Sequence, residues 1–124
     1  MPSIAASLVE PSLRASADPL AVELLARLRH NAADLTRARV TRPFPRTEAL
    51  RIYRQKAANG DRRSVRTDGY PALLAALGEA HESEVLVHGV AFSDAVFLVF
   101  TDPGRSHCFG VLRKLLDRGA GRDR

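Results

Sequence analysis

The chain has 124 residues, of which 45% are hydrophobic, and a formal net charge of +5. This length favours one domain with a modest core, and the hydrophobic content excludes a fully disordered chain. The single cysteine, Cys108, excludes a disulfide framework within one chain, and no run approaches the roughly 18 apolar residues of a membrane helix. We therefore expect a cytoplasmic protein that does not associate with membranes.

The basic residues are unevenly distributed along the sequence. Ten of the nineteen lysines and arginines fall between residues 37 and 66, where only Glu48 and Asp61 oppose them, so that this segment has a net charge of +8. Seventeen of the nineteen are arginines, a bias that a GC-rich coding sequence produces without any selection for binding. The clustering is therefore more informative than the total, and it predicts contact with a polyanion or an acidic surface.

The N-terminal region shows no periodic apolar stripe, and we expect no signal peptide there, because prolines and charged residues interrupt the apolar runs. We expect residues 1–17 to be a flexible, dispensable segment. A single α+β domain over residues 18–116 and a flexible basic tail over residues 117–124 complete the expected organisation.

The first predicted element is a helix over residues 20–38. Asp18 can cap it, and Pro19 fits its first turn, where the missing N–H costs nothing. Apolar residues recur at helical spacing along one side of the segment: Ala21, Leu24, Leu25, Leu28, Ala32 and Leu35. This stripe predicts a helix that packs on the core.

Two further helices are predicted in the middle of the chain. Pro43 and Pro45 make a stiff connection, after which residues 47–58 form a helix that ends at an Asn-Gly pair. The pattern of residues 61–66 fits either a short strand or a loop. Residues 72–80 form a third helix that is apolar nearly all round, which predicts that it is buried.

Three strands are predicted after the helices, over residues 84–92, 95–101 and 107–112. Short connections at Ser93-Asp94 and Asp102-Pro103-Gly104 predict an antiparallel meander. The middle strand is apolar on both faces, so each face needs a covering layer. We expect helices on one face, and the N-terminal helix or a second copy of the protein on the other.

The residues that could carry chemistry do not form a recognisable catalytic or metal signature. Cys108 and His107 are neighbours on a predicted strand, so their side chains point to opposite faces. A cluster of possible cation ligands lies where a helix ends and a strand begins, and it consists of Glu79, His81, Glu82 and Glu84. An exposed acidic loop is the simplest interpretation of this cluster. We expect no cofactor, no metal site and no catalytic residues, and the sequence favours a protein that is not an enzyme.

The remaining candidate site is the arginine-rich segment itself. Guanidinium groups can bind phosphates or carboxylates in forked geometry. The predicted site for nucleic acid or an acidic partner consists of Arg37, Arg39, Arg42, Arg46, Arg51, Arg54, Arg62, Arg63 and Arg66. A solvated surface that binds nothing is the alternative interpretation.

The sequence therefore predicts an α+β fold in which N-terminal helices pack on a C-terminal antiparallel β-meander of three strands. The alternative is a meander of four strands, with the fourth near residues 63–66. The expected function is that of a small non-enzymatic binding or regulatory protein, a homodimer that contacts nucleic acid through residues 37–66. The alternative is a protein–protein interaction module, such as an inhibitor, an immunity-type protein or an adaptor, that docks an acidic partner. An enzyme without a recognisable motif is the third and least favoured class.

Overall fold

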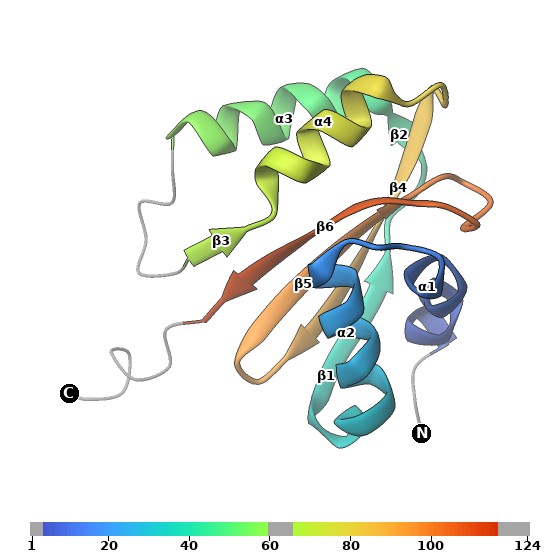
Figure 1. The fold of residues 1–124 in the computed structure, drawn as a ribbon, viewed down its shortest axis with the longest axis vertical. Coiled ribbons are helices and arrows are strands. Elements are labelled where there is room, and N and C mark those ends of the chain that lie inside the picture. The colour runs from blue at the N-terminus through green and yellow to red at the C-terminus, as the bar shows by residue number, and fades with distance from the viewer. Residues whose placement is uncertain (1–3, 60–65, 117–124) are drawn as a thin grey trace.

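A computed structural model describes residues 4–59 and 66–116 of the chain (Figure 1). Its centre is a six-stranded antiparallel sheet in which β1 (Leu35–Val40), β4 (Glu84–Phe92), β5 (Ala95–Thr101), β6 (Cys108–Leu115) and β3 (Arg66–Asp68) lie side by side in that order. The short β2 (Phe44–Pro45) pairs with the beginning of β4. The predicted meander is therefore the middle of a larger sheet, and β1 forms one of its edges.

One face of the sheet is covered by α1 (Ile4–Arg14) and α2 (Pro19–His30). The Asp18 carboxylate accepts a hydrogen bond from the Leu20 amide at 2.9 Å, so the predicted cap and helix start are confirmed. Leu13 of α1 and Leu24 of α2 are fully buried in a core that includes Phe97 of β5. Sequence reasoning missed α1, although its residues contribute directly to this core.

The opposite face of the sheet is covered by α3 (Arg46–Asn59) and α4 (Tyr70–Glu79). Tyr53 of α3 packs edge-on against Phe100 of β5, with their ring centroids 5.0 Å apart. Leu73 of α4 packs directly over Gly110 of β6, where a Cβ atom would lie 3.1 Å from the Leu73 Cα. The glycine therefore permits a close approach of helix and sheet.

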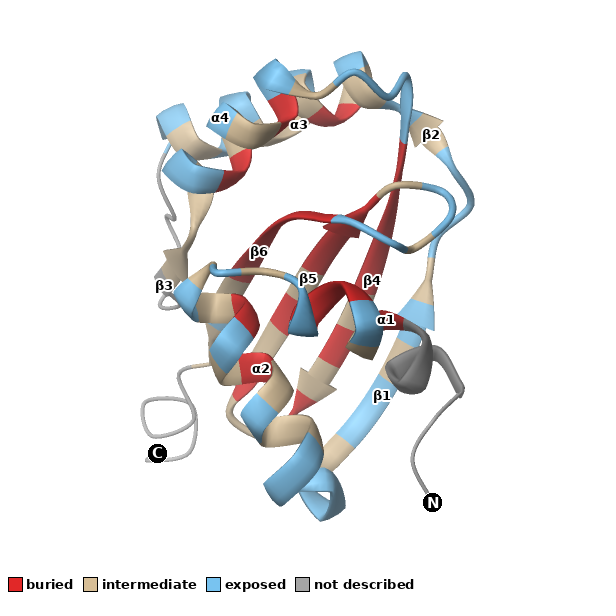
Figure 2. Cartoon of the chain, turned by 45° about the vertical axis from the view of Figure 1, so that its right-hand side comes forward, coloured by how far each residue is buried: buried red, intermediate tan, exposed pale blue. Residues whose placement is uncertain are grey.

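The two helical layers are staggered along the strands. Polar contacts hold α2 near the β4–β5 turn, where both terminal nitrogens of Arg27 bind the Asp94 carboxylate at 2.7 and 3.1 Å. On the other face, Arg46 at the start of α3 donates to the carbonyls of Leu77 and Glu82, near the opposite end of β4. The α3–α4 pair therefore lies over the end of the sheet away from the β4–β5 turn. Figure 2 shows buried and intermediate residues alternating along β5 near that turn, whereas residues 85–88 and 99–101 at the other end are all buried.

Two features of the predicted fold are wrong. The helix over residues 20–38 ends at His30, and residues 35–40 form β1, because their backbone pairs with β4 and the Leu35 side chain packs on the α1–α2 core. The sheet described by the structure also has six strands, where three or four were predicted. The helices cover both of its faces, and the second face is covered by the predicted N-terminal helix, one of the two expected alternatives. By contrast, the strands over residues 84–92 and 95–101 have the predicted boundaries, and β6 extends to Leu115.

The sequence argument for a homodimer rested on the two apolar faces of residues 95–101. Phe97 and Val99 do point to one face and Phe100 to the other, and both faces meet helices of the same chain. Burial of these side chains therefore needs no second copy. The homodimer stays a prediction.

Candidate functional site

The stagger of the helices leaves part of the α3–α4 side of the sheet uncovered. Strand register places residues of five strands in one outer row, farthest from α3 and α4: Arg37, Ala91, Val96, Lys114 and Thr67. The second row, nearer the helices, consists of Arg39, Gly89, Leu98 and Leu112. We call these two rows, without the buried Leu112, the open face.

Exposure decreases from the outer row towards the helices. In the third row, Phe100 is fully buried and Val87 is 6% exposed. Val96 and Leu98 in the outer two rows are intermediate, although they are aliphatic residues in the middle of a central strand. The open face therefore presents apolar surface that the described residues leave partly uncovered.

Three exposed basic residues flank this apolar surface. Arg37 and Arg39 lie on β1 at one side, and Lys114 lies on β6 at the other, about 14 Å away at the usual strand spacing. The Arg39 side chain runs along the face, since a Cβ atom at Gly89 would lie 3.9 Å from the Arg39 Cγ and 3.8 Å from the Leu98 Cδ2. The two rows contain no acidic residue, so the surface combines aliphatic contact area with positive charge.

The predicted site residues are divided between different roles. Arg46 is bound to backbone carbonyls, and its role is to fix the start of α3. Arg51 pairs with Glu48 one turn earlier, and the hydrogen bond from Arg51 lowers the pKa of the Glu48 carboxyl. Arg42 and Arg54 are exposed and away from the open face, in the β1–β2 connection and on α3.

Among the described residues of the predicted set, Arg37 and Arg39 are the two that lie on the open face. Arg62 and Arg63 lie outside the described residues, and Arg66 is placed only as the first residue of β3. The full nine-residue site stays a prediction.

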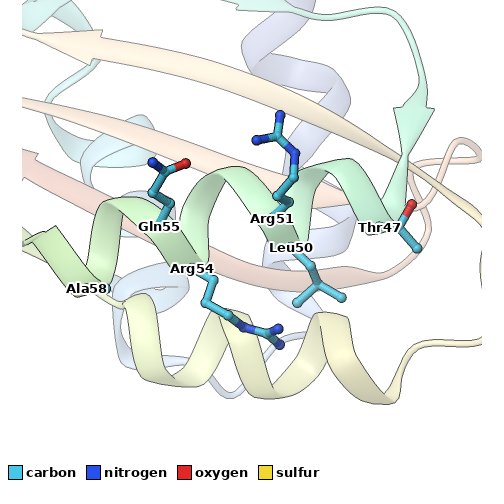
Figure 3. Close-up of a pocket in the computed structure, with 6 residues that line it drawn as sticks. All are labelled: Thr47, Leu50, Arg51, Arg54, Gln55 and Ala58. Carbon is cyan, nitrogen blue, oxygen red and sulfur yellow. The ribbon is translucent and has the colours of Figure 1, made fainter.

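A second surface feature lies along the outer side of α3 (Figure 3). It is a shallow groove of about 500 Å³ lined by Thr47, Leu50, Arg51, Arg54, Gln55 and Ala58. All six belong to one helix at spacings of three and four residues, which is the pattern of a single solvent-facing stripe. The groove adds two guanidinium groups to the surface but brings together no residues distant in the sequence.

The buried titratable groups do not assemble into a catalytic arrangement. Cys108 is 8% exposed, and burial raises the pKa of its thiol to about 12, so the sulfur is not a nucleophile at neutral pH. His107 is exposed and packs edge-on against Phe109, at a centroid distance of 5.1 Å. Over residues 4–59 and 66–116, no group of three or more histidine, cysteine, aspartate or glutamate side chains is placed to hold a metal ion.

Comparison with known proteins gives no relative from which a function could be inferred. No protein-family model matches the chain. No curated protein and no solved structure is significantly similar to it. Among the helices that the structure describes, none combines the length and apolar character needed to cross a membrane.

Sequence reasoning identified the two β1 arginines but missed the rest of the open face. Lys114 lies outside the basic segment, and Val96 and Leu98 read as ordinary core residues of a central strand. Their partial exposure arises because α3 and α4 lie over the other end of this face, and no local pattern in the sequence indicates where these helices lie. The only available signal was that the middle strand needed cover on both faces.

Proposed function

We propose that the protein is a small non-enzymatic binding module whose open face takes an acidic segment of a partner protein. The observation that carries the proposal is the apolar strip of Val96 and Leu98, bracketed by Arg37, Arg39 and Lys114. A partner with aliphatic residues at its centre and carboxylates at its rim complements this surface in both shape and charge.

Two observations favour a protein partner over nucleic acid. Sheets that bind single-stranded nucleic acid stack bases on aromatic side chains, whereas the central residues of the open face are aliphatic, Val96 and Leu98. In addition, Arg46 and Arg51 of the basic segment are already engaged within the chain. Fewer arginines are therefore available to phosphates than the charge of +8 indicates.

The proposal is tested by NMR, with isotope-labelled protein and two probes of equal charge, by mapping which backbone amides change their chemical shift when each probe is added. One probe is a peptide rich in glutamate and leucine, and the other is a mixed-sequence DNA oligonucleotide. We expect the peptide to shift the amides of Gly89, Ala91, Val96 and Leu98 at low salt. Peptide shifts confined to other surfaces, or no shifts at all, would contradict the proposal, and tighter binding of DNA at the open face would assign the surface to nucleic acid.

A matched pair of charge reversals separates the open face from the overall basicity of the chain. The double variant R39E/K114E changes two open-face residues, and R29E/K56E changes two exposed residues elsewhere by the same total charge. With binding measured at an ionic strength of about 0.1 M, we expect R39E/K114E to weaken peptide binding at least about tenfold and R29E/K56E to change it less than about twofold. At this ionic strength exposed charges are screened beyond the Debye length of roughly 10 Å. Equal effects of the two variants would show non-specific electrostatic attraction.

A further inference from the structure

The outer edge of β1 offers backbone hydrogen-bonding groups beside the open face. The Thr41 amide donates to the Val87 carbonyl at 2.9 Å, and the Val87 amide donates to the Thr41 hydroxyl at 3.1 Å. The backbone groups of successive residues in a strand point alternately to its two neighbours. The N–H and C=O groups of Arg39 therefore face β4, as those of Thr41 do, whereas the N–H and C=O groups of Ala38 and Val40 face away from β4. Among the described strands, the sheet order places none on that outer side.

Apart from the charges of Arg37 and Arg39 and the contact of α1 with the strand, this edge shows little of the protection that is common on exposed edges. Proline removes a donor at β2, where Pro45 lies, but β1 itself contains no proline over its six residues. The strand is irregular only between Leu35 and Arg37. Ala38 and Val40 therefore lie in a regular segment that an added strand can follow.

The β1 arginines select the charge of such a strand. Arg37 and Arg39 project to the open-face side, and residues directly opposite each other in antiparallel strands have Cβ atoms about 5 Å apart. If β1 of a second copy paired antiparallel with β1 about Ala38, Arg37 of each copy would lie opposite Arg39 of the other. Centring on either arginine would place that arginine opposite itself, so like charges oppose self-pairing in all three registers.

We propose that an extended segment of the partner adds to the edge of β1 as a further strand, with acidic residues opposite Arg37 and Arg39 and small apolar residues opposite Ala38 and Val40. This inference rests on the proposed function and specifies its binding mode. Main-chain hydrogen bonds to Ala38 and Val40 provide affinity, and the alternating acidic residues provide specificity, as in other cases of strand addition. The acidic side chains of the added strand project to the same side of the sheet as the open face, next to Arg37 and Arg39.

The probe that tests this mode is a labelled seven-residue peptide in which glutamate alternates with valine. In the proposed register the valine amides face β1, so a second peptide with N-methylated valines keeps the charge but cannot form the ladder. By fluorescence anisotropy at low salt, we expect methylation to weaken binding at least about tenfold, because several hydrogen bonds are lost together.

A variant of the protein tests the same hydrogen bonds from the other side. Ala38→Pro removes the outward N–H of residue 38 and leaves the ladder to β4 intact, and Ala38→Val is the control that retains the N–H. We expect the proline variant to bind the unmethylated peptide at least about tenfold more weakly than the valine variant. If Ala38→Pro does not fold, as judged by circular dichroism, the methylated peptide alone decides.

The outcomes separate the binding mode from the proposed function. Equal binding of the two peptides, lost in R39E/K114E, overturns strand addition and leaves the open face as the binding surface. Binding of neither peptide also overturns strand addition, whereas the glutamate–leucine peptide of the preceding experiment tests the proposed function independently. Weaker binding of the methylated peptide together with weaker binding by Ala38→Pro supports the added strand.

Discussion

Lowering the pH should destabilise the fold through His88, whose side chain is buried in β4. Only 1% of this residue is exposed, and its Nε2 lies 2.8 Å from the Thr101 hydroxyl. That hydroxyl donates its single proton to the Asp102 carbonyl, so it must accept from His88, and Nε2 carries the hydrogen. The unprotonated Nδ1 is buried and makes no hydrogen bond within the described residues.

The size of this destabilisation follows from the shifted pKa of His88. Burial, together with the positive charge of Arg105, lowers the pKa of His88 from 6.5 to about 4. One pKa unit corresponds to 1.36 kcal/mol, so the difference amounts to about 3 kcal/mol. Below pH 6.5 the unfolded chain binds a proton that the folded chain does not, so this stability is present above pH 6.5 and is lost as the pH falls towards 4.

The assay is urea unfolding followed by circular dichroism at several pH values between 7 and 4, on the wild type and on His88→Gln. Glutamine can donate to Thr101 but does not titrate, and acidic groups that titrate in this range affect both proteins. We expect the wild type to lose about 3 kcal/mol more than the variant. The exposed His81 provides the control His81→Gln, which replaces a histidine outside the core.

A difference below about 0.5 kcal/mol between the wild type and His88→Gln would refute the reasoning. It would mean that His88 is protonated in the fold, or that the region around it opens to water without loss of the core.

Three other predictions concern packing. Gly110→Ala places a Cβ atom 3.1 Å from the Leu73 Cα and should lower the free energy of unfolding by about 1–3 kcal/mol. Gly78→Ala, at a position in α4 with open space around it, should raise that free energy by up to about 1 kcal/mol. Urea titrations of both variants measure these changes, and equal effects would contradict the close approach of Leu73 to Gly110. Leu13→Ala should cost about 2–5 kcal/mol because Leu13 is 1% exposed, and a cost near zero in the same assay would support the dispensable N-terminus. Cys108 should react with a thiol reagent at pH 8 at least about a hundredfold more slowly in the native state than in urea, because its thiol is buried and protonated; comparable rates would argue against that burial.

Local signals in the sequence predicted the elements that local physics determines. Asp18 and Pro19 mark the start of α2 because a cap and a missing N–H act within one turn. The boundaries of β4 and β5 follow from short turns between apolar runs. These features could be predicted because each depends on residues close together in the sequence.

The errors concern contacts between distant residues. Leu35 fits the stripe of a helix, but its backbone pairs with Phe92, 57 positions later, and that pairing outweighs a weak helical preference. The helix α1 was missed for a related reason, because Pro11 and charged neighbours obscure an apolar stripe to which the buried Val9 and Leu13 belong. In both cases long-range packing, and not local propensity, selects the structure.

Edge protection alone does not account for the basic residues of the sheet. Charged side chains on an exposed strand oppose aggregation, and Arg37 and Arg39 on β1 are consistent with that role. Lys114, however, lies on β6, which is paired on both sides, by β5 and β3, and has no free edge beside it. Its charge is instead directed to the same side of the sheet as the uncovered Val96 and Leu98. A role in protection predicts that only the β1 arginines affect association, whereas a role in recognition predicts that Lys114 contributes as well, which is why Lys114 is part of the decisive charge reversal.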